Sequence, residues 1–327
     1  MPINNFWKDK IKFKDMQVPR IMSAPIDGVI DSPLRQLIRN FSQDNLLFGQ
    51  MRHVATVTNA PNLDEFNVDK IEHPVAFQIA VNTTDFIESA IEKILEQDFF
   101  DMINLNSGCP AKKIAGAGAG CALMGQIPLL EKIIKITKKS IGNKIPFTIK
   151  IRAGFKEKNA LEVSLMAQDL GIDGIIIHPR LKDQGFTGEL DFDLVRKIKD
   201  QVKVPVIFSG NIVDADSAKK TYEFTGVDGL MIGRALYGAP WKLEEIYQGL
   251  LGNVFEISEK EKIKVALKHL ELNSKHYGDK VGFNILKKHL PMYIKGIDGA
   301  ALIRNQLVMA ENEEVMREIL KTLITKL

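Results

Sequence analysis

A free thiol follows an apolar run in this sequence. Residues 99–105 are largely apolar, and the turn 106–110 (N-S-G-C-P) that follows them carries Cys109. A buried strand that ends in a turn bounded by Gly and Pro presents a loop side chain to a cavity from a rigid base. A lone cysteine is more often buried and inert. The chemistry of Cys109 therefore depends on what the other strands place beside it.

Polar and charged side chains also stand at the ends of the other apolar runs. They are Gln78, Asn104, Asn106, Lys150, Arg152, His178, Arg180, Ser209, Asn211 and Arg234. A lysine at the end of an apolar strand is costly to bury unless it meets an anion. Lys150 therefore predicts a negatively charged partner.

Two glycine-containing turns predict a phosphate site. S-G-N-I (209–212) and I-G-R-A (232–235) follow the last two apolar runs, and Arg234 adds a positive charge. Glycines let backbone amides approach a ligand closely, and this is the usual phosphate position in a (β/α)8 barrel. A phosphate anchor, a lysine across the barrel and Gln78 suit flavin mononucleotide (FMN). The scattered histidines and the absence of HExxH and CxxC predict no metal site.

Eight apolar runs would position these side chains. They span 20–24, 46–51, 74–80, 100–105, 146–151, 174–178, 205–209 and 229–232. Helical patterns lie between most of them, including 84–97, 128–140, 160–170, 192–201 and 214–224. Strand and helix alternating eight times predict an α/β fold, a (β/α)8 TIM barrel. A doubly wound open sheet is the alternative, but the first run lacks a following GxGxxG.

The pattern changes near residue 250. Residues 258–327 show helical periodicity throughout, with breaks at Gly278, Pro291, Gly296 and Gly299. We therefore predict a catalytic barrel over 1–250 and a domain of about four helices over 251–327.

Composition restricts the class of protein. The 327 residues include two cysteines, and no apolar stretch has the length of a signal peptide core or a membrane span. These features predict a cytoplasmic protein with free thiols. The net charge of +3 lies in the C-terminal quarter, where Lys287, Lys288, Lys295 and Arg304 cluster. Such a cluster is either a surface for a polyanion or a solvated helix face.

Together these residues resemble the tRNA-dihydrouridine synthases over almost the whole chain. The matching stretches are A-P-I-D-G-V-I-D (24–31), N-S-G-C-P-A-K-K (106–113), I-K-I-R-A-G (149–154), I-H-P-R-L-K-D-Q-G-F-T-G (177–188), S-G-N-I (209–212), M-I-G-R-A-L-Y-G-A-P-W (231–241) and K-K-H-L-P-M-Y-I-K-G (287–296).

The resemblance implies an FMN enzyme that uses NADPH to reduce the C5=C6 bond of uridine in tRNA. It makes Cys109 the general acid that protonates C5, and Asn106 the residue that holds the uracil edge. A thiol of ordinary pKa, about 8.5, is protonated at neutral pH and can donate. The FMN site would comprise Ala24, Pro25, Ile26, Gln78, Lys150, His178, Ser209, Gly210, Asn211, Gly233 and Arg234. Arg152 and Arg180 would lie near the flavin or the substrate.

The resemblance also assigns the helical region to tRNA binding by a monomeric enzyme. A uridine in folded tRNA must leave its stack to reach the barrel. Lys287, Lys288, Lys295 and Arg304 would contact phosphates, with His289 and Tyr293 one turn apart on the same helix. Cys121 is expected to be structural.

Two other functions remain open. One is a flavin reductase acting on a free enone or pyrimidine, which would leave the basic region without a role. The other is an RNA-binding protein with a catalytically idle barrel, against which the set Cys109, Lys150, His178 and Arg234 argues. A yellow purified protein would exclude the idle barrel, and dihydrouridine lost from tRNA on gene deletion would exclude the free substrate.

Overall fold

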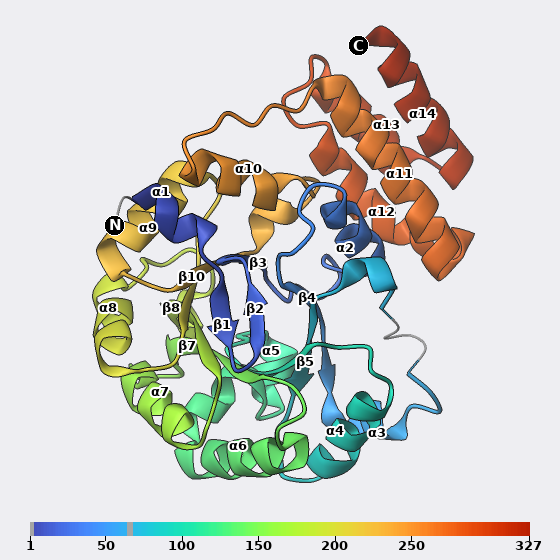
Figure 1. Ribbon diagram of the computed structural model, residues 1–327. Helices are drawn as coiled ribbons and strands as arrows, with labels where there is room; N and C mark the ends of the chain where they lie inside the picture. The colour runs from blue at the N-terminus through green and yellow to red at the C-terminus, as the bar shows by residue number, and fades with distance from the viewer. Residues whose placement is uncertain (1–2, 64–67) are drawn as a thin grey trace.

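The computed structural model describes residues 3–63 and 68–327 (Figure 1). Eight parallel strands form a barrel in the order β3-β10-β9-β8-β7-β6-β5-β4. They are β3 (Ile21–Ser23), β4 (Leu47–His53), β5 (Val75–Ala80), β6 (Met102–Ser107), β7 (Phe147–Gly154), β8 (Gly174–Leu181), β9 (Val206–Ser209) and β10 (Gly229–Ile232). The Ser23 amide donates to the Leu46 carbonyl at 3.1 Å and joins β3 to the segment that begins β4. The predicted barrel is confirmed, since an open doubly wound sheet would have two edges.

Helices cover the outside of the barrel (Figure 1). They are α1 (Ile3–Lys8), α2 (Ser32–Arg39), α3 (Val54–Asn59), α4 (Ile87–Glu96), α6 (Ile127–Ile141), α7 (Ala160–Asp169), α8 (Phe192–Gln201), α9 (Ala215–Thr225) and α10 (Lys242–Leu250). The short helix α5 (Lys112–Gly116) follows β6 and is not part of this outer layer (Figure 1). Short 3-10 turns lie at η2 (Lys70–Glu72), η3 (Gly120–Gly125), η4 (Lys182–Gln184) and η5 (Arg234–Leu236).

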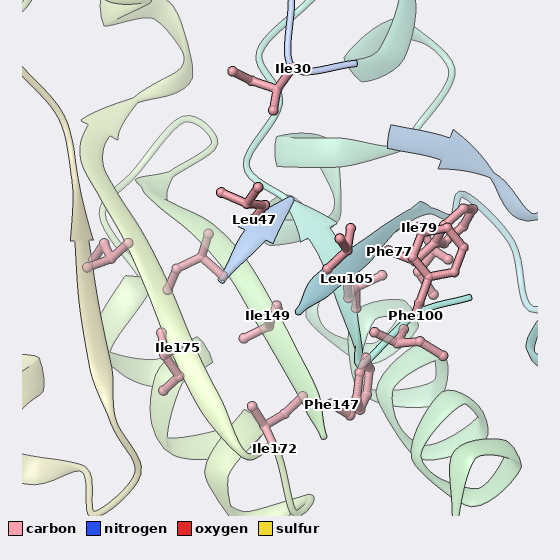
Figure 2. Packing of buried hydrophobic residues seen from close by; sticks show 14 of the residues in the cluster. Ile30, Leu47, Phe77, Ile79, Phe100, Leu105, Phe147, Ile149, Ile172 and Ile175 are labelled. Atoms are coloured by element: carbon pink, nitrogen blue, oxygen red, sulfur yellow. The ribbon is translucent and has the colours of Figure 1, made fainter. Parts of the chain in front are cut away.

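Alternate residues of each strand belong to two separate cores. Outward residues such as Ile149 and Ile175 pack against the helices (Figure 2). Inward residues such as Met102, Ile176 and Met231 form a smaller cluster inside the barrel. Because strand side chains alternate between the two faces, inward positions on every strand face the same interior.

A hairpin that the sequence analysis missed adds to the inner core. Strands β1 (Ile11–Phe13) and β2 (Met16–Val18) pair antiparallel. Ile11, Phe13 and Val18 are buried with the inward side chains of the barrel strands. The Phe13 ring also packs against Gly174, the first residue of β8, so the hairpin covers the amino-terminal end of the barrel.

Four helices follow the barrel: α11 (Glu259–Tyr277), α12 (Asp279–Tyr293), α13 (Ala300–Met309) and α14 (Glu313–Lys326). Ser258 and Glu261 form a capping box at the start of α11, which satisfies backbone amides that the helix leaves free. A separate buried cluster, including Ile263, Leu286 and Leu320, lies between these helices. None of the described helices is long and apolar enough to cross a membrane.

The helical domain packs closely on the barrel. The Tyr277 hydroxyl donates to the Asp31 carboxylate at 3.1 Å, which joins α11 to the start of α2. Gly238, in the segment between β10 and α10, has φ +66° and lies against α12. A Cβ at Gly238 would stand 2.5 Å from Cβ of Met292. Only glycine allows the two backbones to approach this closely.

Candidate active site

Inward strand positions change from apolar to polar toward the carboxyl ends of the strands. On β6 the change runs from Met102 through Asn104 to Asn106, and on β8 it leads from Ile176 to His178. Because side chains alternate between the two faces of a strand, the inward polar side chains of neighbouring strands form successive layers at the same end of the barrel. Hydrogen-bonded register pairs Gln78 with Asn104. The sheet therefore brings together side chains that are far apart in the sequence.

Amides link β5, β6 and β7 inside the barrel. The Gln78 amide donates to Asn104 Oδ1 at 2.7 Å, and the Asn104 amide donates to Thr148 Oγ1 at 2.9 Å. The Asn106 amide donates to Gln78 Oε1 at 2.7 Å. Each buried amide is thereby partnered, which fixes the orientation of its side chain.

Asn106 also shapes the cysteine loop. Its Oδ1 accepts hydrogen bonds from the backbone amides of Gly108, at 3.1 Å, and Cys109, at 2.9 Å. With its amide nitrogen bonded to Gln78, Asn106 holds the loop rather than projecting freely into the cavity. Cys109 is partly exposed and lines the cavity.

Arg152 holds the same loop from the other side. Its guanidinium donates to the carbonyls of Gly108, Leu181 and Gly185 at 2.9, 2.9 and 2.8 Å. These bonds tie the cysteine loop to the segment after β8. Arg152 borders the cavity, and burial lowers its pKa. Its geometry is that of a residue that positions the Cys109 loop.

Lys150 is a cation facing the cavity. Among the residues that the structure describes, no carboxylate lies within ion-pair distance of its ammonium group. Burial, reinforced by the charge of Arg152, lowers the pKa of Lys150 to about 8. The anionic partner that the sequence predicts for Lys150 would therefore have to be a ligand.

His178 is a neutral imidazole. Burial lowers its pKa to about 2, and the charges of Lys150, Arg152, Arg180 and Arg234 add to this effect. Arg180 donates to His178 Nε2 at 3.2 Å. A guanidinium can only donate, so the imidazole proton stands on Nδ1. Arg180 is buried, also bonds the Gly188 carbonyl, and does not line the cavity.

The two glycine turns lie beside His178 and Arg234. A Cβ at Gly210 would stand only 2.8 Å from Cδ2 of Leu190 and in ordinary contact, 3.6 Å, with Nδ1 of His178. Asn211 has φ +50°, and its Oδ1 accepts from Arg234 at 3.2 Å. A Cβ at Gly233 would stand 3.3 Å from Cδ1 of Ile26. Both turns line the cavity, and their glycines bring backbone close to it without side chains.

One cavity of about 1450 Å³ collects these groups. All eleven residues predicted to hold FMN line it: Ala24, Pro25, Ile26, Gln78, Lys150, His178, Ser209, Gly210, Asn211, Gly233 and Arg234. Asn106, Cys109 and Arg152 border the same cavity, which continues between α10 and α12 to Tyr293 and Lys295. Lysine, arginine and backbone amides around a cavity of this size fit a phosphate-bearing cofactor such as FMN.

The predicted RNA contacts divide into two groups. Lys287, Lys288, Lys295 and Arg304 are partly or fully exposed. His289 is 0% exposed and does not line the cavity, so the prediction that it contacts RNA is wrong. Tyr293 is 1% exposed and borders the cavity, and its hydroxyl shares a 3.1 Å hydrogen bond with His269 inside the helical domain. The two residues are buried because they occupy the face of α12 that turns toward α11 and the barrel.

Phe186 is a cavity residue that the sequence analysis did not assign. Half of its side chain is exposed, and its ring lies 5.5 Å from the Arg152 guanidinium and 5.4 Å from that of Arg234. The signal was a phenylalanine between two glycines in the stretch Q-G-F-T-G. Cys121 is buried, which raises its pKa to about 11, and its amide bonds the Cys109 carbonyl at 3.1 Å. That environment agrees with a structural role.

A cavity at the carboxyl ends of the strands, lined by a thiol and several cations, defines an enzyme of the (β/α)8-barrel class. The family profile described as Dihydrouridine synthase (Dus) matches residues 22–326. The chain belongs to the dihydrouridine synthase family.

Curated relatives match most of their own length. A probable tRNA-dihydrouridine synthase from Rickettsia conorii is 31% identical over 305 residues, 91% of each chain. tRNA-dihydrouridine synthase B from Pasteurella multocida is 32% identical over 294 residues, 87% of this chain and 86% of that protein. Among solved structures, an old yellow enzyme homologue from Zymomonas mobilis has a TM-score of 0.55 at 13% identity, covering 72% of this chain and 90% of the other. This last likeness concerns the fold alone.

Proposed function

We propose that the protein reduces the C5=C6 bond of uridine in tRNA to 5,6-dihydrouridine, using FMN and NADPH. The observation that carries the proposal is the single cavity that joins Cys109, Lys150 and the two glycine turns. Family membership gives the reaction class. Bound FMN would supply the hydride, taken from NADPH, for C6 of the uracil.

Different residues of the predicted FMN site would bind different parts of the cofactor. Arg234 and the backbone at Gly210, Asn211 and Gly233 would hold the phosphate. Lys150 would place its positive charge at the pyrimidine edge of the ring, where negative charge develops on reduction. The neutral His178 would donate from Nδ1, because Arg180 occupies Nε2. Ala24, Pro25, Ile26, Gln78 and Ser209 would complete the binding site.

Cys109 would protonate C5. Its loop is held by three hydrogen bonds, two from backbone amides to Asn106 and one from Arg152 to the Gly108 carbonyl, so the thiol has a defined position before substrate arrives. A proton donor fixed in place loses less freedom in the transition state. Asn106 would orient the uracil edge through the position it gives this loop.

The helical domain would bind the tRNA around the target. Turning a base out of its stack costs a few kcal/mol, which phosphate contacts elsewhere must offset. Lys287, Lys288, Lys295 and Arg304 are accessible for this role. In this proposal the enzyme works as a cytoplasmic monomer, and an elution volume corresponding to a dimer would contradict that part.

The experiment is to map dihydrouridine in RNA from cells with and without the gene, and to repeat the reaction with purified protein. We expect a yellow protein that oxidises NADPH and forms dihydrouridine in tRNA lacking it. A colourless protein, or unchanged dihydrouridine in all tRNAs of the deletion strain, would contradict the proposal. Turnover of free uridine or a small enone at rates matching tRNA would favour the small-molecule alternative.

A further inference from the structure

His289 belongs to α12 of the helical domain, but two of its contacts are with the barrel. Its Nε2 lies 3.3 Å from the Gly28 carbonyl. Its ring stacks on Tyr237, with centroids 4.7 Å apart and planes 12° from parallel. The side chain is fully buried and does not line the cavity. His289 therefore contacts the barrel loops on the side that faces away from the cavity.

The two loops that it contacts are both walls of the cavity. The segment 24–31 after β3 contributes Ala24, Pro25, Ile26 and Asp27 to the lining. The segment after β10 contributes Gly233, Arg234 and Tyr237. Strands β3 and β10 are neighbours in the barrel. One imidazole thus touches two loops that contribute residues to the predicted FMN site, and one of them is the loop proposed to hold the phosphate.

The hydrogen bond to Gly28 has a defined direction. A carbonyl only accepts, so the imidazole carries its proton on Nε2. Nδ1 is buried with no hydrogen-bond partner among the described residues, which fits the unprotonated nitrogen of a neutral ring. Gly28 has φ +69° and sits in a turn where the amides of Val29 and Ile30 bond the Ile26 carbonyl. Fixing Gly28 therefore also fixes the turn that presents Ile26.

We propose that His289 is a positioning residue that holds the β3 and β10 loops in the arrangement that binds FMN. The inference rests on the proposed function only in taking FMN as the ligand of the cavity. It gives α12 two roles on different faces, since Lys287 and Lys288 beside His289 are accessible to RNA. Tyr277, through Asp31, anchors the far end of the β3 loop in the same way.

The test measures FMN affinity of the full-length apoprotein by quenching of FMN fluorescence. We expect His289→Ala to raise the Kd for FMN about tenfold, because the Gly28 carbonyl loses its donor and Tyr237 its stacking partner. His289→Gln keeps a donor of similar reach and should stay within about threefold of wild type. His289→Asn keeps an amide too short to reach Gly28 and should resemble alanine.

His269→Ala is the matched control. His269 is buried in the same cluster, 5.2 Å from His289 between ring centroids, and its described contacts lie within the helical domain. It should lower the melting temperature while leaving the Kd for FMN within about twofold. Equal FMN affinity of wild type and His289→Ala, or equal weakening by His269→Ala, would overturn the inference.

Two further outcomes keep the test decisive. If His289→Ala does not fold, the Kd values of His289→Gln and His289→Asn are compared instead. Equal Kd values for these two variants would contradict the positioning role. If the wild-type apoprotein does not bind FMN, the proposed function fails. Wild-type binding with unaffected variants contradicts only the positioning role.

Discussion

The barrel mouth and the core of the helical domain both bury polar side chains, but these side chains face different surroundings. At the mouth, Lys150 and His178 border a cavity of about 1450 Å³. In the helical domain, His269 and Asn273 on α11 are fully buried but do not line that cavity. A buried polar group therefore indicates a ligand where it opens onto a cavity, and otherwise indicates packing.

The largest effect is expected at the mouth, at Cys109. Cys109→Ala should lower the rate of uridine reduction in tRNA by about 100-fold or more, the usual contribution of a general acid. FMN content and reduction by NADPH should stay unchanged, because the loop is held through the backbone. Stopped-flow absorbance separates the two half-reactions. Turnover on tRNA within about threefold of wild type would show that the thiol is not the donor.

The next effect concerns the outer face of α12. Lys287→Glu combined with Lys288→Glu should weaken tRNA binding by about 10- to 100-fold and reduce the slope of log Kd against log salt by about 2. Lys321→Glu with Lys326→Glu on α14 is the control of equal charge. If both double variants bind tRNA alike, net charge matters and the α12 surface does not.

The pH dependence of FMN binding should show whether Lys150 faces the ligand. Because the pKa of Lys150 is lowered to about 8, part of the apoprotein lacks this charge near pH 8.5. Binding an anion favours the charged form, so FMN binding should take up protons there and weaken as pH rises. Calorimetry in buffers of different ionisation enthalpy measures the uptake, and Lys150→Met should abolish it. Unchanged uptake in that variant would assign the titration to another group.

The same lysine affects stability with a defined sign. Its pKa is lower in the folded than in the unfolded chain, so between about pH 8 and 10.5 the unfolded chain binds more protons. Apoprotein stability should therefore rise with pH across that window. Urea unfolding should show a smaller rise for Lys150→Met.

The smallest effect is expected inside the helical domain. Tyr293→Phe removes a hydroxyl bonded to His269 and should lower the free energy of unfolding by about 1 kcal/mol. Affinity for tRNA should not change, because the hydroxyl is buried. Weaker tRNA binding at unchanged stability would instead show that the Tyr293 hydroxyl contacts RNA.

The same contrast explains which parts could be predicted from the sequence. On a strand, side chains alternate between two faces, so a polar residue at the end of an apolar run has a known direction. Lys150 and His178 were located in this way. On a helix, Lys287, Lys288 and His289 point about 100° apart, so three adjacent residues cover most of the circumference. The composition of this stretch predicted a basic surface, but only packing against Gly28 and Tyr237 showed which residue turns inward.

The β1–β2 hairpin was missed for a related reason. Its three-residue strands give too short a pattern for periodicity to detect, and their burial depends on the barrel that they cover. The close approaches at Gly238 and Gly174 likewise depend on chain segments far away in the sequence.

The hairpin also has a kinetic consequence. Ile11, Phe13 and Val18 close the amino-terminal end of the barrel, so reductant and RNA would share the entrance at the opposite end. Under the proposed function, NADPH and tRNA would occupy this entrance one after the other, and FMN would hold the reducing equivalents between the two binding events. Initial rates measured against both substrates should then give parallel double-reciprocal lines, whereas intersecting lines would mean that both are bound together.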